Sequence, residues 1–109
     1  MLNINFIGKN RNLMKIQSLV LKNRYAGVKI NIFTDLENID ADDGIYVVFS
    51  SIEEEFSNWI KNLKNKKIYL IFFAETDVFE TSIIYNKILS KDSGEPLQTS
   101  IERGIKYFG

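Results

Sequence analysis

The residues best placed to do chemistry form a short basic turn near the start of the chain. They are one glycine, two cations and two carboxamides, in the order Gly8, Lys9, Asn10, Arg11 and Asn12. The turn lies between an alternating apolar run and an amphipathic run, so it joins a predicted strand to a predicted helix. A helix start presents unpaired N–H groups and the positive end of the helix dipole, which together favour anions. The turn therefore predicts a phosphate site. An ordinary strand-to-helix turn is the alternative, because one glycine falls short of a phosphate-binding fingerprint.

Composition limits the other chemistry that the chain can perform. The 109 residues include no histidine and no cysteine, which removes thiolate nucleophiles, the usual zinc ligands and the commonest general base. The 14 basic and 14 acidic side chains balance, so the field of the whole molecule gives no reason to expect nucleic acid or an anionic membrane as a partner. No signal peptide or membrane span is recognised. We expect one cytoplasmic domain over residues 1–109.

An acidic run follows the second predicted strand. Its members are Asp35, Glu37, Asp40, Asp42 and Asp43. A calcium loop of the EF-hand type needs glycine at its sixth position and glutamate at its twelfth, and neither falls there when the count starts at Asp40. We interpret the run as a solvated loop and predict no metal site.

The turn and the loops must be positioned by alternating strands and helices. Strands are predicted at residues 2–7, 28–33, 45–49 and 68–73. The second strand alternates with polar residues, as at an edge, whereas the third and fourth are continuously apolar, as in the centre of a covered sheet. Helices are predicted with N-caps at Asn12, Ser51 and Thr99, the last two as capping boxes, and a further helix is predicted over residues 79–89. Gly27 is expected to end the first helical segment.

Apolar spacing predicts which face of each helix is buried. The predicted inner faces are Leu13, Ile16, Leu19 and Val20 with the stem of Arg24 in the first helix; Phe56, Trp59, Ile60 and Leu63 in the second; Phe79, Ile83 and Ile88 in the third; and Ile101, Ile105 and Phe108 in the last. Trp59 is therefore interpreted as a core residue.

These elements predict an α/β fold, a three-layer α/β/α open parallel sheet of about four strands in the order 2-1-3-4. The eleven residues from Thr34 to Gly44 are too few for a regular helical crossover, so we expect an irregular connection. Ligands of such sheets bind at the carboxyl ends of strands beside the switch in strand order. Those ends carry residues 8–12, 50–51 and 74–77.

Several segments match one known family. Ile4, Phe6, Lys9 and Asn12 fall where its first strand and its Ser-Lys-Thr-Gly-Asn phosphate loop carry like residues, and residues 43–50 resemble its third strand. Residues 89–91 and 96–97 resemble its Ile-Ser-Arg segment and a following Val-Pro, and residues 101–108 its last helix. The chain thus resembles the small flavodoxins that serve ribonucleotide reductase, which use FMN to help assemble the radical cofactor of the reductase's metal-binding subunit.

The resemblance implies a flavodoxin-like fold, FMN as cofactor, electron transfer as activity and the metal-binding subunit of ribonucleotide reductase as partner. Residue by residue, it implies a flavin site made of Gly8, Lys9, Asn10, Arg11, Asn12, Ser50, Ser51, Glu75 and Thr76.

Departures from the family pattern fall at the flavin site. Asn10 and Arg11 replace its Thr-Gly pair, and Ser50-Ser51 runs directly into a helix that opens with three glutamates. The family's final strand, between Pro96 and the last helix, is missing. We therefore predict a degenerate flavin site and no tight FMN binding. The alternative to electron transfer is a flavin-free protein-binding module without catalytic activity, with Tyr85, Tyr107 and Phe108 as a candidate partner patch.

Overall fold

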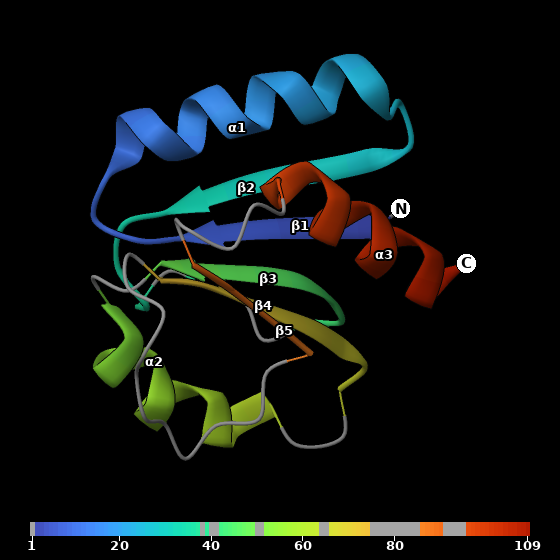
Figure 1. Ribbon diagram of the computed structural model, residues 1–109. Coiled ribbons are helices and arrows are strands. Elements are labelled where there is room, and N and C mark those ends of the chain that lie inside the picture. Colours follow the sequence, from blue (N-terminus) through green and yellow to red (C-terminus); the bar gives the residue numbers. More distant parts are fainter. Residues whose placement is uncertain are drawn as a thin grey trace.

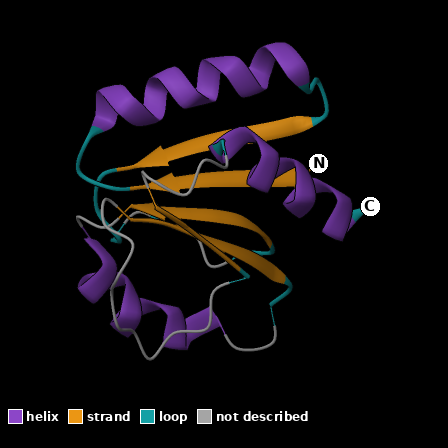
Figure 2. Ribbon diagram, viewed as in Figure 1, coloured by secondary structure: helices purple, strands orange, loops and turns teal. Residues whose placement is uncertain are grey.

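A computed structural model describes residues 2–37, 39, 42–49, 52–63, 66–74, 86–90 and 96–109. Five parallel strands form one sheet in the order β2-β1-β3-β4-β5. Their bounds are β1 Leu2–Ile7, β2 Val28–Phe33, β3 Gly44–Phe49, β4 Ile68–Ala74 and β5 Lys87–Ser90. Helices α1 (Arg11–Arg24) and α3 (Leu97–Phe108) cover one face, and α2 (Glu53–Trp59), continued by the 3₁₀ helix η2 (Ile60–Leu63), covers the other (Figures 1 and 2).

The predicted fold class is confirmed. The order 2-1-3-4, the parallel pairing and the helices on both faces are those of a doubly wound, flavodoxin-like sheet. Strand β2 lies at an edge, as its polar alternation predicted, and β3 and β4 lie inside the sheet. All six residues of β3 are buried, because helices cover both of its faces.

A fifth strand extends the sheet beyond β4. Strand β5 pairs with β4 from Ile71 opposite Lys87 to Ala74 opposite Ser90. The predicted helix over residues 79–89 is therefore wrong at its C-terminal end; residues 79–85 lie outside the described residues. Leu89 explains the difference, because it is fully buried in the core beneath α1 and α3. Burial in the sheet outweighed the local helical spacing.

Two apolar cores fill the layers on either side of the sheet. The core under α1 and α3 includes Ile4, Phe6, Met14 and Ile101, and the core under α2 includes Tyr46, Phe56 and Phe72. Successive strand residues alternate between these cores, as the pleat requires. Trp59 packs on the second core, half-buried, with its ring centroid 5.5 Å from that of Phe56. The side chains of Leu63 and Ile88 lie outside the described residues.

Helix α1 buries a different face from the predicted one. Met14, Ser18 and Leu21 are buried, whereas Ile16, Leu19 and Val20 are 60%, 58% and 43% exposed. The prediction of an inward face built on Ile16, Leu19 and Val20 is therefore wrong. Arg24 is also exposed, and Leu13 is half-buried.

The reason lies in Ser18, which the apolar spacing discounted as polar. Its hydroxyl donates to the carbonyl of Lys15 over 2.8 Å, so a small, internally satisfied side chain faces the sheet. Met14, Ser18 and Leu21 then form one stripe at helical spacing, and half-buried Tyr25 packs on the same core just beyond the helix end.

The predicted N-caps differ from those observed. Asn10 caps α1 in place of Asn12, Ile52 precedes α2 where Ser51 was predicted, and Pro96 precedes α3 where Thr99 was predicted. Helix α3 begins earlier because Leu97, 6% exposed, docks its first turn in the core. Gly27 does not end α1, which stops at Arg24.

The connection from β2 to β3 is irregular in its described residues, as predicted. Residues 34–37 form bends and a turn, and Leu36 and Ile39 pack on the core under α2. Near this connection, polar side chains of β1 and β2 point to the same side of the sheet. Asn5, 6% exposed, donates through Nδ2 to the carbonyl of Ile45 (3.4 Å) and accepts through Oδ1 from Asn31 Nδ2 (3.0 Å).

Candidate functional site

The basic turn lies at the carboxyl edge of the sheet, where the strand order switches. Strand β1 pairs with both β2 and β3, so Gly8 leaves β1 between the ends of its two neighbours. The Gly8 N–H donates to the carbonyl of Phe33 over 3.1 Å. A Cβ on Gly8 would lie 3.0 Å from Cβ of Phe49, so a larger residue here would require Phe49 to shift, and glycine suits the close approach. The location is the predicted one.

The helix start behind the turn is capped by the chain itself. Asn10 Oδ1 accepts from the Leu13 N–H over 3.1 Å, and the Asn10 carbonyl accepts from the Met14 N–H over 3.3 Å. A carboxamide therefore occupies the position that a bound anion would take against the Leu13 N–H. Of the first helical N–H groups, those of Arg11 and Asn12 are the ones that this cap does not satisfy.

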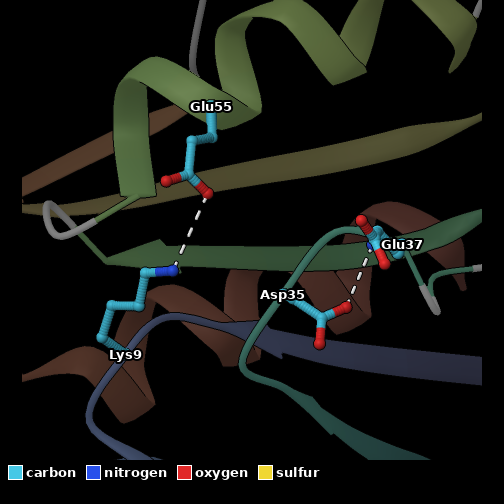
Figure 3. A network of polar contacts seen from close by, with 4 residues as sticks. All are labelled: Lys9, Asp35, Glu37 and Glu55. Atoms are coloured by element: carbon cyan, nitrogen blue, oxygen red, sulfur yellow. Dashed lines mark hydrogen bonds and ion pairs between the residues drawn. The ribbon is translucent and has the colours of Figure 1, made fainter.

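One acidic side chain lies next to the charge of Lys9. Lys9 Nζ lies 3.9 Å from Glu55 Oε2, and both side chains are about half exposed. On the facing loop, the Asp35 carboxylate accepts from the Glu37 N–H over 3.1 Å (Figure 3). Exposed Glu54 lies next to Glu55 in α2. An exposed pair at this distance contributes little to stability, but the Glu55 carboxylate counters the positive potential that an incoming phosphate needs.

Of the predicted site residues, the structure brings Gly8, Lys9, Asn10, Arg11 and Asn12 together in one turn. Ser50, Ser51, Glu75 and Thr76 lie outside the described residues. Arg11 and Asn12 have exposed side chains, and their N–H groups are the helical ones that the Asn10 cap leaves without an acceptor. This arrangement suits weak binding of a small anion.

Two cavities were not anticipated from the sequence. The smaller, about 140 Å³, is a polar cleft over β1 and β2 lined by Asn3, Asn5, Lys29, Asn31, Phe33 and Asp42. It lies beside the short β2-to-β3 connection, which contributes Asp42 and whose described residues form no helix. The alternating polar residues of β1 and β2 are a sequence signal for it, although the same alternation is also typical of an edge strand.

The larger cavity, about 440 Å³, is an apolar groove between the end of α1 and α3. Its lining includes Leu2, Arg24, Tyr25, Val28, Ile105 and Phe108, and we call it the α1–α3 groove. It lies at the amino ends of β1 and β2, at the opposite edge of the sheet from the basic turn. Residues from four elements form it, which no single sequence pattern reveals.

The predicted aromatic patch is described in part. Tyr107 is 47% exposed and its ring centroid lies 5.5 Å from that of Tyr69. Lys67 Nζ lies 5.0 Å from the Tyr107 ring and 5.1 Å from the Phe108 ring, close enough for cation–π attraction. Phe108 is half-buried, and Tyr85 lies outside the described residues.

Comparisons of the chain with protein-family models, with curated proteins and with solved structures found no match. The fold therefore defines the class of the protein as an α/β protein with a flavodoxin-like sheet. Among the described residues, no group of three acidic side chains lies close enough to hold a metal ion, and no helix is long and apolar enough to cross a bilayer.

Proposed function

We propose that this chain is a flavodoxin-like protein-binding module whose flavin site has degenerated and which has no catalytic activity of its own. The turn that would hold the FMN phosphate supports this most directly. The Asn10 carboxamide caps the Leu13 N–H, and Lys9 Nζ lies 3.9 Å from a glutamate of α2. An FMN site needs hydrogen-bond donors directed at the phosphate and loops that flank the ring. Here the Leu13 N–H already donates to Asn10, and the Lys9 cation already lies next to Glu55.

Titration with FMN tests the proposal. Without a preorganised phosphate cradle, we expect a dissociation constant in roughly the micromolar-to-millimolar range, measured by calorimetry and by quenching of flavin fluorescence. The matched control is a Lys9→Ala/Arg11→Ala double variant, which should weaken any binding that does occur through this turn. A stoichiometric complex with a dissociation constant below about 1 μM would overturn the degenerate site.

FMN-dependent electron transfer to the metal-binding subunit of ribonucleotide reductase is the second candidate. Its support is the position of the Gly8 turn at the switch in strand order, where ligands of such sheets bind. A tight, stoichiometric FMN complex that is reducible in solution would favour it over the first proposal.

Retention on the immobilised metal-binding subunit tests the partner separately from the flavin. Retention without FMN supports a binding module that keeps the reductase as its partner. Flow-through of the flavin-free protein contradicts the reductase as partner while leaving the FMN titration to decide about the flavin.

A further inference from the structure

The outer side of α1 carries exposed aliphatic side chains next to positive charges. Ile16, Leu19 and Val20 are 60%, 58% and 43% exposed, and their spacing places them next to one another on the helix. Lys15 and Lys22, both exposed, are seven residues apart and lie together beside Leu19. We call these five residues the α1 outer face. It lies opposite the buried stripe of the same helix.

The charge on this helix has one sign. Its 14 residues include Arg11, Lys15, Lys22 and Arg24 and no acidic residue. No carboxylate one turn away on α1 therefore offsets any of these cations. A surface that is both positive and apolar is complementary to one that is negative and apolar.

The α1 outer face continues into the α1–α3 groove. Val20 and Arg24 are one turn apart, and Arg24 lines the groove. Helix α3 lies beside α1 on the same face of the sheet (Figure 1), and Gln98 Nε2 of α3 donates to Gln17 Oε1 of α1 over 2.7 Å. Beyond Arg24 the groove offers the side chains of Tyr25, Ile105 and Phe108. Its volume of about 440 Å³ lies within the usual range of binding pockets.

We propose that the α1 outer face and the α1–α3 groove together bind an acidic amphipathic helix of a partner protein. The apolar side of that helix packs on Ile16, Leu19 and Val20 and inserts a side chain into the groove, and its carboxylates pair with Lys15, Lys22 and Arg24. This deepens the proposed function, on which it rests, by naming the surface and the chemistry of the partner.

Two other occupants fit this surface less well. A symmetric pair of copies would bring the same patch together with itself, so the four cations of one α1 would meet the four of the other. A bilayer surface is bound by helices that bury a wide apolar face, commonly with aromatic residues. The main apolar stripe of α1 is committed to the core through Met14 and Leu21, and the α1 outer face contains no aromatic residue.

The test uses the whole chain and a synthetic peptide of about five helical turns, with leucines along one side and glutamates elsewhere. A matched peptide carries glutamine in place of every glutamate. We expect the glutamate peptide to bind in roughly the micromolar range, with affinity falling as salt rises. Amide shifts should map to residues 15–25 and to the groove side of α3.

Variants of exposed residues locate the binding. Lys15→Glu/Lys22→Glu should weaken binding of the glutamate peptide about tenfold or more, and Ile16→Gln/Leu19→Gln should also weaken it. The control Lys29→Glu/Lys61→Glu makes the same charge change on the opposite face of the sheet, where Lys29 lines the polar cleft and Lys61 belongs to η2, and it should alter affinity by less than about twofold. Circular dichroism of each variant checks that it is folded.

Four results would overturn this assignment: no binding of the glutamate peptide, equal binding of the glutamine peptide, shifts confined to another surface, or tighter binding to phosphatidylserine vesicles than to the peptide. Dimerisation through α1 in sedimentation equilibrium would also contradict it. FMN titration tests the basic turn, which lies at the opposite edge of the sheet from the α1–α3 groove. A tight FMN complex would therefore refute the proposed function without changing the peptide result. Failure of the peptide alone would refute only this surface.

Discussion

Asn10 and Asn12 lie two residues apart, yet only one of them caps a helix. Asn10 precedes the first helical residue, so its side-chain oxygen reaches the Leu13 N–H over 3.1 Å. Asn12 is already inside the first turn and is exposed, so it has no comparable role in starting α1. Because Asn10 is the cap, its carboxamide occupies the helix start, where a bound anion would otherwise accept from the Leu13 N–H.

Removing the cap should destabilise the protein. We expect Asn10→Ala to lower the free energy of unfolding by about 0.5–2 kcal/mol, because the Leu13 N–H loses its acceptor. The control Asn12→Ala should change it by less than about 0.5 kcal/mol. Urea unfolding of both variants measures this, and equal losses would contradict the assignment of Asn10 as the cap.

Glu55 should weaken anion binding at the turn. In Glu55→Gln the carboxylate near Lys9 becomes neutral, so we expect inorganic phosphate to bind about two- to fivefold more tightly, within the millimolar range. Amide shifts over residues 8–13 during phosphate titration report the binding. Loss of those shifts in Lys9→Ala/Arg11→Ala would locate it, whereas an unchanged affinity in Glu55→Gln would show that Glu55 does not oppose anions.

At the scale of elements, the orientation of α1 can be tested with two leucines of the same helix. Leu21 is fully buried and Leu19 is 58% exposed. Leu21→Ala should therefore lower the free energy of unfolding by about 2–5 kcal/mol through cavity formation, and Leu19→Ala by less than about 0.5 kcal/mol. A larger loss for Leu19→Ala would restore the inward face predicted from apolar spacing.

Strands β1 and β3 approach each other closely at Gly44, and this contact between elements can also be tested. A Cβ on Gly44 would lie 2.7 Å from the carbonyl oxygen of Asn3, a backbone atom, whereas nothing lies within 4 Å of one on Gly27. Gly44→Ala should cost about 1–3 kcal/mol. Gly27→Ala should be neutral or stabilising by up to about 1 kcal/mol. Thermal unfolding of both variants measures the contrast, and a neutral Gly44→Ala would show that the strands can move apart.

The strands were more predictable than the helices, for a physical reason. Strands β1 and β2 have the predicted bounds, because period-two alternation and β-branched runs give one consistent assignment. Helix α1 offers two apolar stripes, and the choice between them depends on the sheet beneath. Strand β5 depends on pairing with β4, which local spacing does not encode.

The position of the candidate site could be predicted from the sequence, but the contacts that its residues make within the chain could not. Strand order alone places Gly8 at the switch point. The contact of Lys9 with Glu55 of α2 and that of Asn10 with the Leu13 N–H depend on side-chain geometry, which the sequence does not give. The polar alternation of β1 and β2 marks part of the smaller cavity in the sequence, whereas the α1–α3 groove depends on the relative placement of four elements and could be recognised only in three dimensions.

The whole molecule is neutral in total but uneven in distribution. Its formal net charge at pH 7 is zero, while α1 carries cations alone and the carboxyl edge carries Asp35, Glu37, Glu54 and Glu55. A charge distribution of this kind interacts with charged surfaces through patches rather than through its net charge.

Ion exchange should reveal this distribution. We expect the protein to be retained on a cation exchanger at pH 7 and low salt despite its zero net charge, because the exchanger meets the α1 outer face. Lys15→Glu/Lys22→Glu should elute earlier than Lys29→Glu/Lys61→Glu, although the two variants have the same net charge. Identical elution of these variants would show that the α1 cations affect retention only through the net charge of the protein.

The amide pair of Asn5 and Asn31 determines how the edge strand aligns. The two residues are directly opposite in the β1–β2 ladder and share a 3.0 Å hydrogen bond. A slip of one residue would turn Asn31 to the other face, and a slip of two would set Asn5 opposite Lys29 or Phe33. Either shift leaves a buried carboxamide without this partner, at a cost of about 1–3 kcal/mol. The pair thus selects a single alignment for β2, whose other inward contacts are the apolar side chains of Val28, Ile30, Ile32 and Phe33 and carry no directional hydrogen bond.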